Sequence, residues 1–181
     1  MTTKLEIVTW PQANSYIAEI ARQMHIGSWR PDYIVGVTRG GAIPATMLSH
    51  YLDVPLETLR ICLREHEGLE SNTWMAEEAF GYVKEENRLF PTQYTEARLR
   101  KNILIVDDIN DTGATLQWIK DDWMTSCFKD NIAWQWIWGG TVRFATLINN
   151  TASNFDVNYS ALDINKLEND VWFRFPWEQW W

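Results

Sequence analysis

The sequence predicts an α/β fold in which helices flank a parallel sheet. Short apolar runs typical of buried strands recur along the 181 residues, and segments with helical spacing separate them. Polar turns follow two of these runs, at the strand ends where parallel sheets bind ligands. The composition agrees, because 46% hydrophobic and 22% charged residues, with only 9 glycines and 6 prolines, are typical of a folded core. A chain of this length predicts one domain over 1–181.

The first part of the chain is expected to alternate strands with helices. A strand at 5–9 precedes a helix that Thr9 caps and that ends near 25–28. Buried strands follow at 32–38 and 56–63, the second with alternating apolar residues. A helix between these strands would have an apolar face made of Ile43, Met47, Leu48 and Tyr51.

The interval 64–100 is polar and rich in glutamate, with weak periodicity. Intervals of this length without clear elements are usually active-site lids, functional loops or disordered inserts. We expect a mobile lid over this interval, with some helix around 74–83.

The second part of the chain begins with its most strand-like run, 102–106, followed by a polar turn and a helix at 114–124. Residues 132–138 are apolar on all sides, and their pattern leaves helix and strand open. Further short strands are expected at 142–148, 157–162 and 171–175.

The charge and cysteine content limit the function classes. There are 24 acidic against 16 basic residues, a net charge of −8, which argues against general nucleic-acid binding but not against an anionic small molecule. Cys62 and Cys127 cannot form a disulfide scaffold, and no run of 18 apolar residues or secretory signal is present. We therefore expect a cytoplasmic protein that binds no membrane. The 12 tryptophans, most of them after Trp118, favour packing roles and a homo-oligomer.

The segment NILIVDDINDTGATL carries the strongest chemical signal. Asp107 and Asp108 leave a buried strand on opposite faces, so they suit two neighbouring hydroxyls better than one shared metal ion. The amides of the following helix start, with the hydroxyls of Thr112 and Thr115, form a cradle for a phosphate, and Gly113 allows close approach. A ribose 5-phosphate presents both features.

Three other interpretations compete at this segment. Two adjacent acids could cap a loop without any ligand. The spacing DDxxD also binds Mg²⁺-diphosphate on helices of prenyl-transfer enzymes, but here an apolar β-type run precedes it. A Walker P-loop requires GxxxxGK[ST], which the sequence lacks.

This segment, with YIVGVTRGGAIPATMLSHYL in the middle of the chain and VWFRFPWE near its end, resembles the type I phosphoribosyltransferases, and among them the bacterial xanthine-guanine (purine) group. The likeness covers most of the chain except 64–100 and about 125–140. It implies a parallel-sheet, Rossmann-like core flanked by helices, with a small C-terminal hood at about 155–181.

By this resemblance, Asp107 and Asp108 contact the ribose hydroxyls, in a region that holds Mg²⁺ directly or indirectly. Asp111 would be the general base or acid at the imidazole nitrogen of a purine. It also opens the 5-phosphate loop, which would comprise Asp111, Thr112, Gly113, Ala114 and Thr115. The diphosphate loop would comprise Thr38, Arg39, Gly40 and Gly41. Its arginine would contact the diphosphate, and the peptide bond between its first two residues would be cis.

The same resemblance places Trp172 against the face of the purine and the backbone of Phe173 at the edge of the base. The competing interpretation of this segment is a hydrophobic tail packed on the core. Asn150 stands where the family has a lysine that donates to an exocyclic oxygen, which leaves the identity of the base open. The Ser-Tyr pair of the family's mobile loop is absent, and the candidates to replace it are Tyr82, Lys84, Arg88 and Tyr94.

The residues and the resemblance together predict a Mg²⁺-dependent enzyme of purine salvage. It would transfer ribose 5-phosphate from phosphoribosyl diphosphate (PRPP) to a purine-like base and release diphosphate. The alternative is a regulatory protein of the same fold that binds PRPP or a nucleotide without turnover. A tryptophan-rich interaction module is a third interpretation, which predicts no Mg²⁺-dependent PRPP binding.

Overall fold

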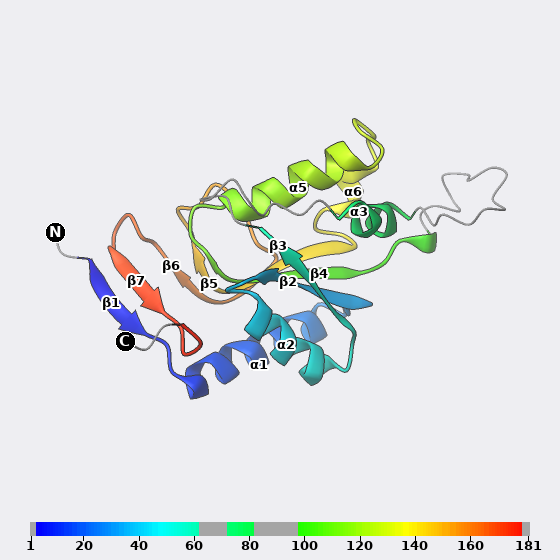
Figure 1. The fold of residues 1–181 in the computed structure, drawn as a ribbon. Helices are drawn as coiled ribbons and strands as arrows, with labels where there is room; N and C mark the ends of the chain where they lie inside the picture. Colours follow the sequence, from blue (N-terminus) through cyan, green and yellow to red (C-terminus); the bar gives the residue numbers. More distant parts are fainter. Residues whose placement is uncertain (1–2, 62–71, 82–97, 179–181) are drawn as a thin grey trace, which may run out of the picture.

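A five-stranded parallel sheet forms the centre of the molecule in the computed structural model, which describes residues 3–61, 72–81 and 98–178 (Figure 1). The strand order is β3-β2-β4-β5-β6, and every neighbouring pair is parallel. The strands are β2 (Tyr33–Thr38), β3 (Leu56–Arg60), β4 (Ile103–Asn110), β5 (Val142–Asn150) and β6 (Tyr159–Ile164). This arrangement confirms the predicted α/β class with a parallel sheet.

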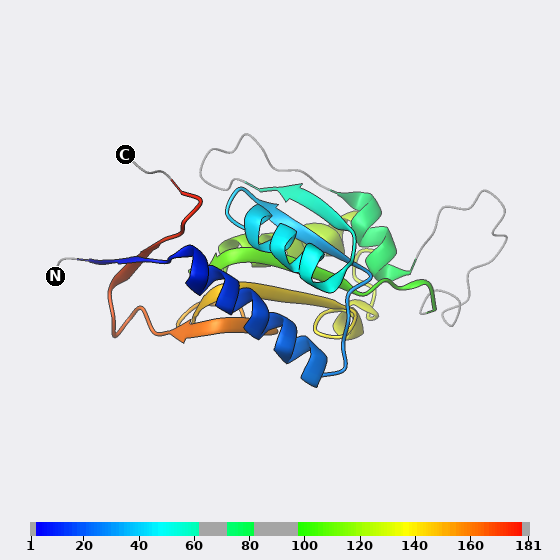
Figure 2. The ribbon, with the colours of Figure 1, turned by 90° about the horizontal axis from the view of Figure 1, so that it is seen from below.

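Helices cover both faces of this sheet. On one face lie α1 (Trp10–Ile26) and α2 (Ala42–Leu52), which Figure 2 shows in front of the strands. The other face carries α3 (Thr73–Phe80), α5 (Ala114–Ser126) and α6 (Trp134–Ile137). Because both faces of the central strands are covered, these strands read as continuous apolar runs.

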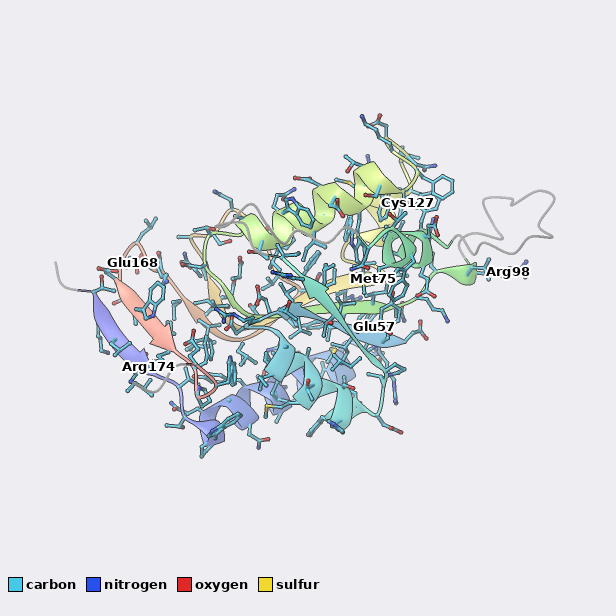
Figure 3. The ribbon with its side chains drawn as sticks, in the orientation of Figure 1. Glu57, Met75, Arg98, Cys127, Glu168 and Arg174 are labelled. Carbon is cyan, nitrogen blue, oxygen red and sulfur yellow. The ribbon has the colours of Figure 1, made fainter. Side chains whose placement is uncertain are left out.

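The core is divided by the sheet into two halves (Figure 3). Val35 and Ile105 point toward α3, α5 and α6, whereas their neighbours Ile34 and Leu104 point toward α1 and α2. Alternation of side chains along a strand explains this division. The half under α5 contains most of the buried aromatic rings, including Trp123, whose side chain is fully buried.

A second, two-stranded sheet lies beside the main one and forms the hood. It pairs β1 (Lys4–Ile7) with β7 (Val171–Arg174) in parallel, so strands from the two ends of the described chain lie side by side (Figure 1). The predicted hood at 155–181 differs from the observed one, because β6 pairs with β5 in the main sheet. Only β7 and the segment after it belong to the hood, together with β1.

Local signals explain where the first helix begins. Thr9 caps α1 as predicted, because its hydroxyl accepts from the amide of Gln12 while the Gln12 side chain accepts from the amide of Thr9. Pro11 lies in the first turn, where its missing N–H costs nothing.

The predicted apolar face of α2 is partly wrong. The buried residues are Pro44, Ala45 and Leu48, whereas Tyr51 is 63% exposed. The reason lies in β2, where a Cβ on Gly36 would come 2.8 Å from the Cβ of Ala45. The helix therefore packs closely against β2 at Ala42 and Ala45, which leaves no room there for a larger side chain.

The central strand β4 extends to Asn110 rather than ending at 106, so the two adjacent acids lie within it. Asp107 pairs with Thr146 and Asn110 with Asn149, because β5 continues alongside for the same length. Residues 132–138, left open by the sequence, contain the short helix α6.

The interval 64–100 is described only in part. The helix expected around 74–83 is present as α3, whereas the expected lid and its four candidate residues lie outside the described residues. Cys127 is a buried free thiol, and burial raises its pKa to about 12. Cys62 lies outside the described residues. Over the described ranges, none of the helices has the length and apolar character needed to span a membrane.

Gly41, at the start of α2, lies directly against the backbone of β4. A Cβ at this position would lie 2.2 Å from the carbonyl oxygen of Val106 and 2.8 Å from the Cα of Asp107. Both neighbours are backbone atoms of a buried strand, so neither can move aside cheaply. The glycine thus sets the separation between the diphosphate-loop candidate and the two acids.

We expect Gly41→Ala to destabilise the protein by about 1–3 kcal/mol, as overpacked cores do. Gly27→Ala is the control, because a Cβ there would meet its nearest atom at 3.4 Å. Urea denaturation of both variants measures the difference. Equal stability of the two variants would contradict the crowding described at Gly41.

Candidate active site

The two adjacent acids lie at the carboxyl end of β4, in the middle of the sheet. The amide of Asp108 donates to Oδ1 of Asp107 at 3.0 Å, which fixes the orientation of the first carboxylate. A Cβ on Gly40 would lie 2.3 Å from Oδ2 of Asp108, so the loop after β2 rests directly on the second carboxylate. The peptide bond between Thr38 and Arg39 is cis, as the resemblance implies.

Burial shapes the electrostatics of these acids. Burial raises the pKa of Asp107 well above its usual range, and the charge of Asp108 raises it further. For Asp108, burial and then the charge of Glu178 raise the pKa to about 6. The site therefore concentrates negative charge that a cation or a hydrogen-bond donor would relieve.

The loop from Asp111 to the start of α5 lies beside the acids. Gly113 caps α5 with φ +85°, a left-handed conformation, and a Cβ there would lie 2.6 Å from the Cβ of Phe155. The hydroxyl of Thr112 accepts from the amide of Ala114 at 3.4 Å. The remaining amides of the first helical turn have no partner within the helix, and they favour an anion.

A buried asparagine, Asn110, holds the end of β4 in place just before the loop at Asp111. The side-chain nitrogen of Asn110 donates to the carbonyl of Phe155 at 2.8 Å. The hydroxyl of Ser153 donates to Oδ1 of Asn110 at 3.0 Å. Asn110 is 1% exposed, and it joins the end of β4 to the loop between β5 and β6. Sequence reasoning did not find this role, because a single asparagine at a strand end carries no distinctive pattern.

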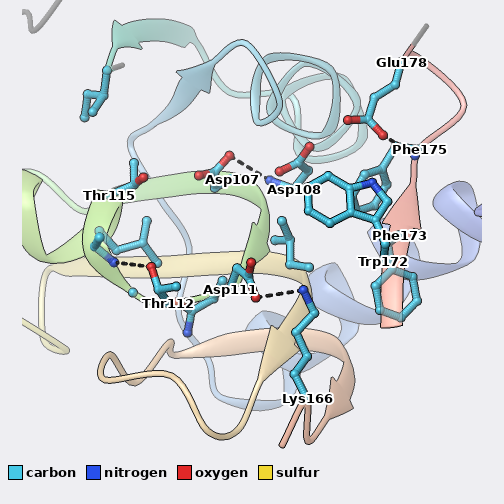
Figure 4. Close-up of a pocket in the computed structure, with 16 residues that line it drawn as sticks. Asp107, Asp108, Asp111, Thr112, Thr115, Lys166, Trp172, Phe173, Phe175 and Glu178 are labelled. Carbon is cyan, nitrogen blue, oxygen red and sulfur yellow. Dashed lines mark hydrogen bonds and ion pairs between the residues drawn. The ribbon is translucent and has the colours of Figure 1, made fainter. Parts of the chain in front are cut away.

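An ion pair closes the side of the site opposite the two adjacent acids. The ammonium of Lys166 lies 2.8 Å from Oδ1 of Asp111, and 5.8 Å from the ring centre of Trp172 (Figure 4). Lys166 follows β6 in the connection to the hood. The sequence analysis missed this lysine, because no spacing in its segment relates it to Asp111.

The side chain of Asn150 makes its hydrogen bonds with backbone groups around the site. Its side-chain nitrogen donates to the carbonyl oxygen of Asp111 at 2.8 Å, and its oxygen accepts from the amides of Ala152 and Lys166. Asn150 is 8% exposed, and both polar atoms of its side chain form hydrogen bonds with backbone groups. It ties together three loops around the site, and the expectation that it binds the base stays a prediction.

The hood contributes Trp172 and Phe173. The Trp172 side chain is 52% exposed, whereas that of Phe173 packs into the core beside α1. The carbonyls of Asp170 and Arg174 accept from the amides of Lys4 and Val8, on the β1 side of β7. Since successive peptide groups of a strand point to opposite edges, those of Phe173 face away from β1. On that same edge, the amide of Phe175 donates to the Glu178 carboxylate at 2.7 Å.

A cavity of about 580 Å³ connects these groups (Figure 4). Its walls include both adjacent acids, the whole loop from Asp111 to Thr115, and the hood residues Trp172 and Phe173. Lys166 and Glu178 also line it, and the sequence analysis named neither. The loop of Thr38 to Gly41 borders the acids without lining the cavity, and Arg39 is exposed. The size suits a small-molecule ligand.

A family model described as phosphoribosyl transferase domain matches residues 4–179. The chain belongs to this family. It is 26% identical over 156 residues to the xanthine-guanine phosphoribosyltransferase of Cereibacter sphaeroides, covering 84% of this chain and 71% of that protein. It is also 27% identical over 109 residues to xanthine phosphoribosyltransferase 1 of Saccharomyces cerevisiae, covering 55% of this chain and half of that relative's length.

A solved structure supports the fold. The purine phosphoribosyltransferase from Pyrococcus horikoshii matches with a TM-score of 0.62 and 22% identity, covering 97% of this chain and 95% of that one. The predicted membership of the type I phosphoribosyltransferases, with likeness to the bacterial xanthine-guanine group, is thus confirmed.

The raised pKa of Asp108 predicts how stability depends on pH. Burial favours the protonated form of Asp108 in the folded protein, so this group does not lower the free energy of unfolding below its ordinary pKa of about 3.9. As pH rises through about 6, the buried carboxyl must ionise, and this stability is lost. We expect Asp108→Asn to raise the melting temperature at pH 8, by about 2–4 °C for each kcal/mol recovered. The gain should shrink toward zero near pH 4.

Thermal denaturation at both pH values measures this gain, with Asp156→Asn as the control. Asp156 is exposed on the loop between β5 and β6. An equal shift at pH 4 and pH 8, or a lower melting temperature at pH 8, would contradict the burial cost of Asp108.

Proposed function

We propose that the protein transfers ribose 5-phosphate from PRPP to a nitrogen of a purine base, with release of diphosphate. The observation that supports this most directly is the single cavity wall formed by the two buried acids and the amide-rich start of α5. Neighbouring hydroxyls and a phosphate are the groups that such a wall would bind. The names of the curated relatives support the purine class.

The sugar would lie across the ends of β4 and α5. Asp107 and Asp108 accept hydrogen bonds from the two ribose hydroxyls. These hydrogen bonds replace those to water that the two carboxylates lose through burial. The 5-phosphate lies against the amides from Thr112 to Thr115. The diphosphate lies toward the loop at Arg39 and Gly40, which borders Asp108.

The donor set suits Mg²⁺ only when the substrate supplies part of it. The described residues contain no group of three or more histidines, cysteines or acids that could hold a metal ion. Magnesium is commonly held by one or two carboxylates together with substrate phosphates, and Asp107 and Asp108 fit that pattern. When bound, the ion would neutralise charge on the leaving diphosphate.

The base would lie between the hood and Asp111. Trp172 offers an exposed ring for stacking, and the peptide groups of Phe173 face the edge of β7 on the cavity side. As the base nitrogen bonds to the anomeric carbon, the bond to diphosphate breaks. The carboxylate of Asp111 takes the proton that the imidazole ring loses.

A panel of bases tests the proposal. Guanine, xanthine, hypoxanthine, adenine, uracil and orotate are each incubated with PRPP and Mg²⁺, and diphosphate release is measured together with nucleotide formation. We expect release with at least one purine and none with uracil or orotate. PRPP binding without turnover by any base would favour the regulatory alternative, and absence of Mg²⁺-dependent PRPP binding would overturn the proposal.

Asp111→Asn tests the proton-transfer role. An amide cannot take the proton, so we expect turnover to fall more than tenfold while PRPP affinity stays within about twofold, since general base catalysis contributes about 10²–10⁴-fold. Steady-state kinetics and calorimetry with PRPP measure the two quantities. The exposed Asp156→Asn is again the control, and an unchanged rate for Asp111→Asn would refute the role.

A further inference from the structure

We propose that two copies of this chain associate through β1, the outer strand of the hood. The two β1 strands would pair antiparallel about a two-fold axis that passes through Leu5, so that the two hoods merge into one continuous sheet. This inference does not rest on the proposed function. The homo-oligomer expected from the sequence would then have a defined interface.

The open edge of β1 is the first support. In the described part of the chain, β7 is the only strand paired with β1, and Figure 1 shows β1 as the outermost strand at this end of the molecule. The amides of Lys4 and Val8 donate to carbonyls on the β7 side, at 3.0 and 2.9 Å. Because successive peptide groups of a strand point to opposite edges, those of Leu5 and Ile7 face outward. Such an edge is a template for another strand.

The apolar face of the hood is the second support. In the parallel register Leu5 lies beside Trp172 and Ile7 beside Arg174, so these four side chains share one face of the sheet. Leu5 is 51% exposed, Ile7 54% and Trp172 52%. Large apolar side chains gathered on one face in this way mark an interaction surface. Leu5 and Ile7 lie on the strand with the open edge, so a strand added there would cover part of both.

The charges of β1 specify the partner. Lys4 and Glu6 alternate with the apolar residues on the opposite face, and the Lys4 Nζ lies 2.6 Å from Oε1 of Glu6. In an antiparallel pair centred on Leu5, Lys4 lies opposite the partner's Glu6, and Glu6 lies opposite the partner's Lys4. Opposite charges across a strand pair stabilise it, whereas like charges destabilise it. A second copy of β1 therefore carries the complementary pattern by symmetry.

The backbone agrees with this register. The amide and carbonyl of Leu5 face outward, so the two copies of this residue can exchange both hydrogen bonds at the axis. Thr3 and Ile7, two positions to either side, would do the same with each other. An axis through Glu6 would fail, because its peptide groups face β7 and two carboxylates would meet there. An axis through Ile7 would set Lys4 against the partner's first helix rather than against a strand.

The length of β1 sets the strength of the contact. The strand has four residues, so the interface would belong to the small and weak class. Three or more strands with an apolar face are nevertheless more stable than two, and this favours the merged sheet. We therefore expect the full chain to be monomeric at about 1 µM and increasingly dimeric toward about 300 µM, as sedimentation velocity measures.

Two charge reversals test the pairing. Lys4→Glu or Glu6→Lys alone would set like charges opposite each other in both cross-strand pairs, so we expect each homodimer to weaken at least about tenfold. An equimolar mixture of the two variants restores an opposite charge at each of these pairs. The mixed dimer should therefore recover most of the wild-type affinity, which sedimentation with a fluorescent label on one variant measures.

Lys129→Glu is the matched control. Lys129 is exposed on the connection after α5, away from the hood, so this variant should dimerise like the wild type. A loss that mixing fails to restore would show that the substitutions act within each chain's own hood, and it would overturn the proposed register. A wild type that stays monomeric at every concentration, or an association that both single variants keep, would overturn the interface itself.

Discussion

Two neighbouring carboxylates held out of water at the end of a central strand are the constraint on which the site depends. Like charges at this separation repel, and low solvation makes each harder to ionise. The surrounding structure brings backbone donors toward Asp107, from the amides of Asp108 and Gly41, while the loop at Gly40 packs against Asp108. Burial of these carboxylates costs the free protein stability, and such costs are typical of sites that bind ligands.

The polar groups of the cavity are distributed over two parts of the fold. The sheet and the start of α5 provide acids and amides, which suit a phosphorylated sugar. The hood and the connection that leads to it provide an indole, free peptide groups and an ammonium, which suit a planar heterocycle. Asn150 joins these parts, since it contacts Asp111 on one side and Lys166 on the other. The fold contributes the placement of these two parts relative to each other.

Much of this could be predicted from the sequence, for reasons that differ between residues. Asp107 to Thr115 lie on one strand-turn-helix unit, so their neighbourhood follows from chain continuity. The order of strands and helices followed from apolar runs, and Thr9 marked the start of α1. Contacts between distant segments escaped prediction. Lys166 meets Asp111 across 55 positions, and Asn150 turns inward because three loops converge on it. The face of α2 escaped because Gly36 on another element decides it.

The hood has a consequence for how the molecule responds to stress. Its two strands pair residues near opposite ends of the described chain, Lys4 with Val171 and Ile7 with Arg174, and this closes a very long loop with only four residues in β1. Opening of this element would expose Val171, Phe173 and Phe175 from the core beside α1, and it costs less than unfolding the whole molecule. A molecule opened in this way would keep the wall of acids and amides at the ends of β4 and α5 and lose the indole of Trp172. Heat or mild denaturant would then alter the hood side of the cavity before the sheet side.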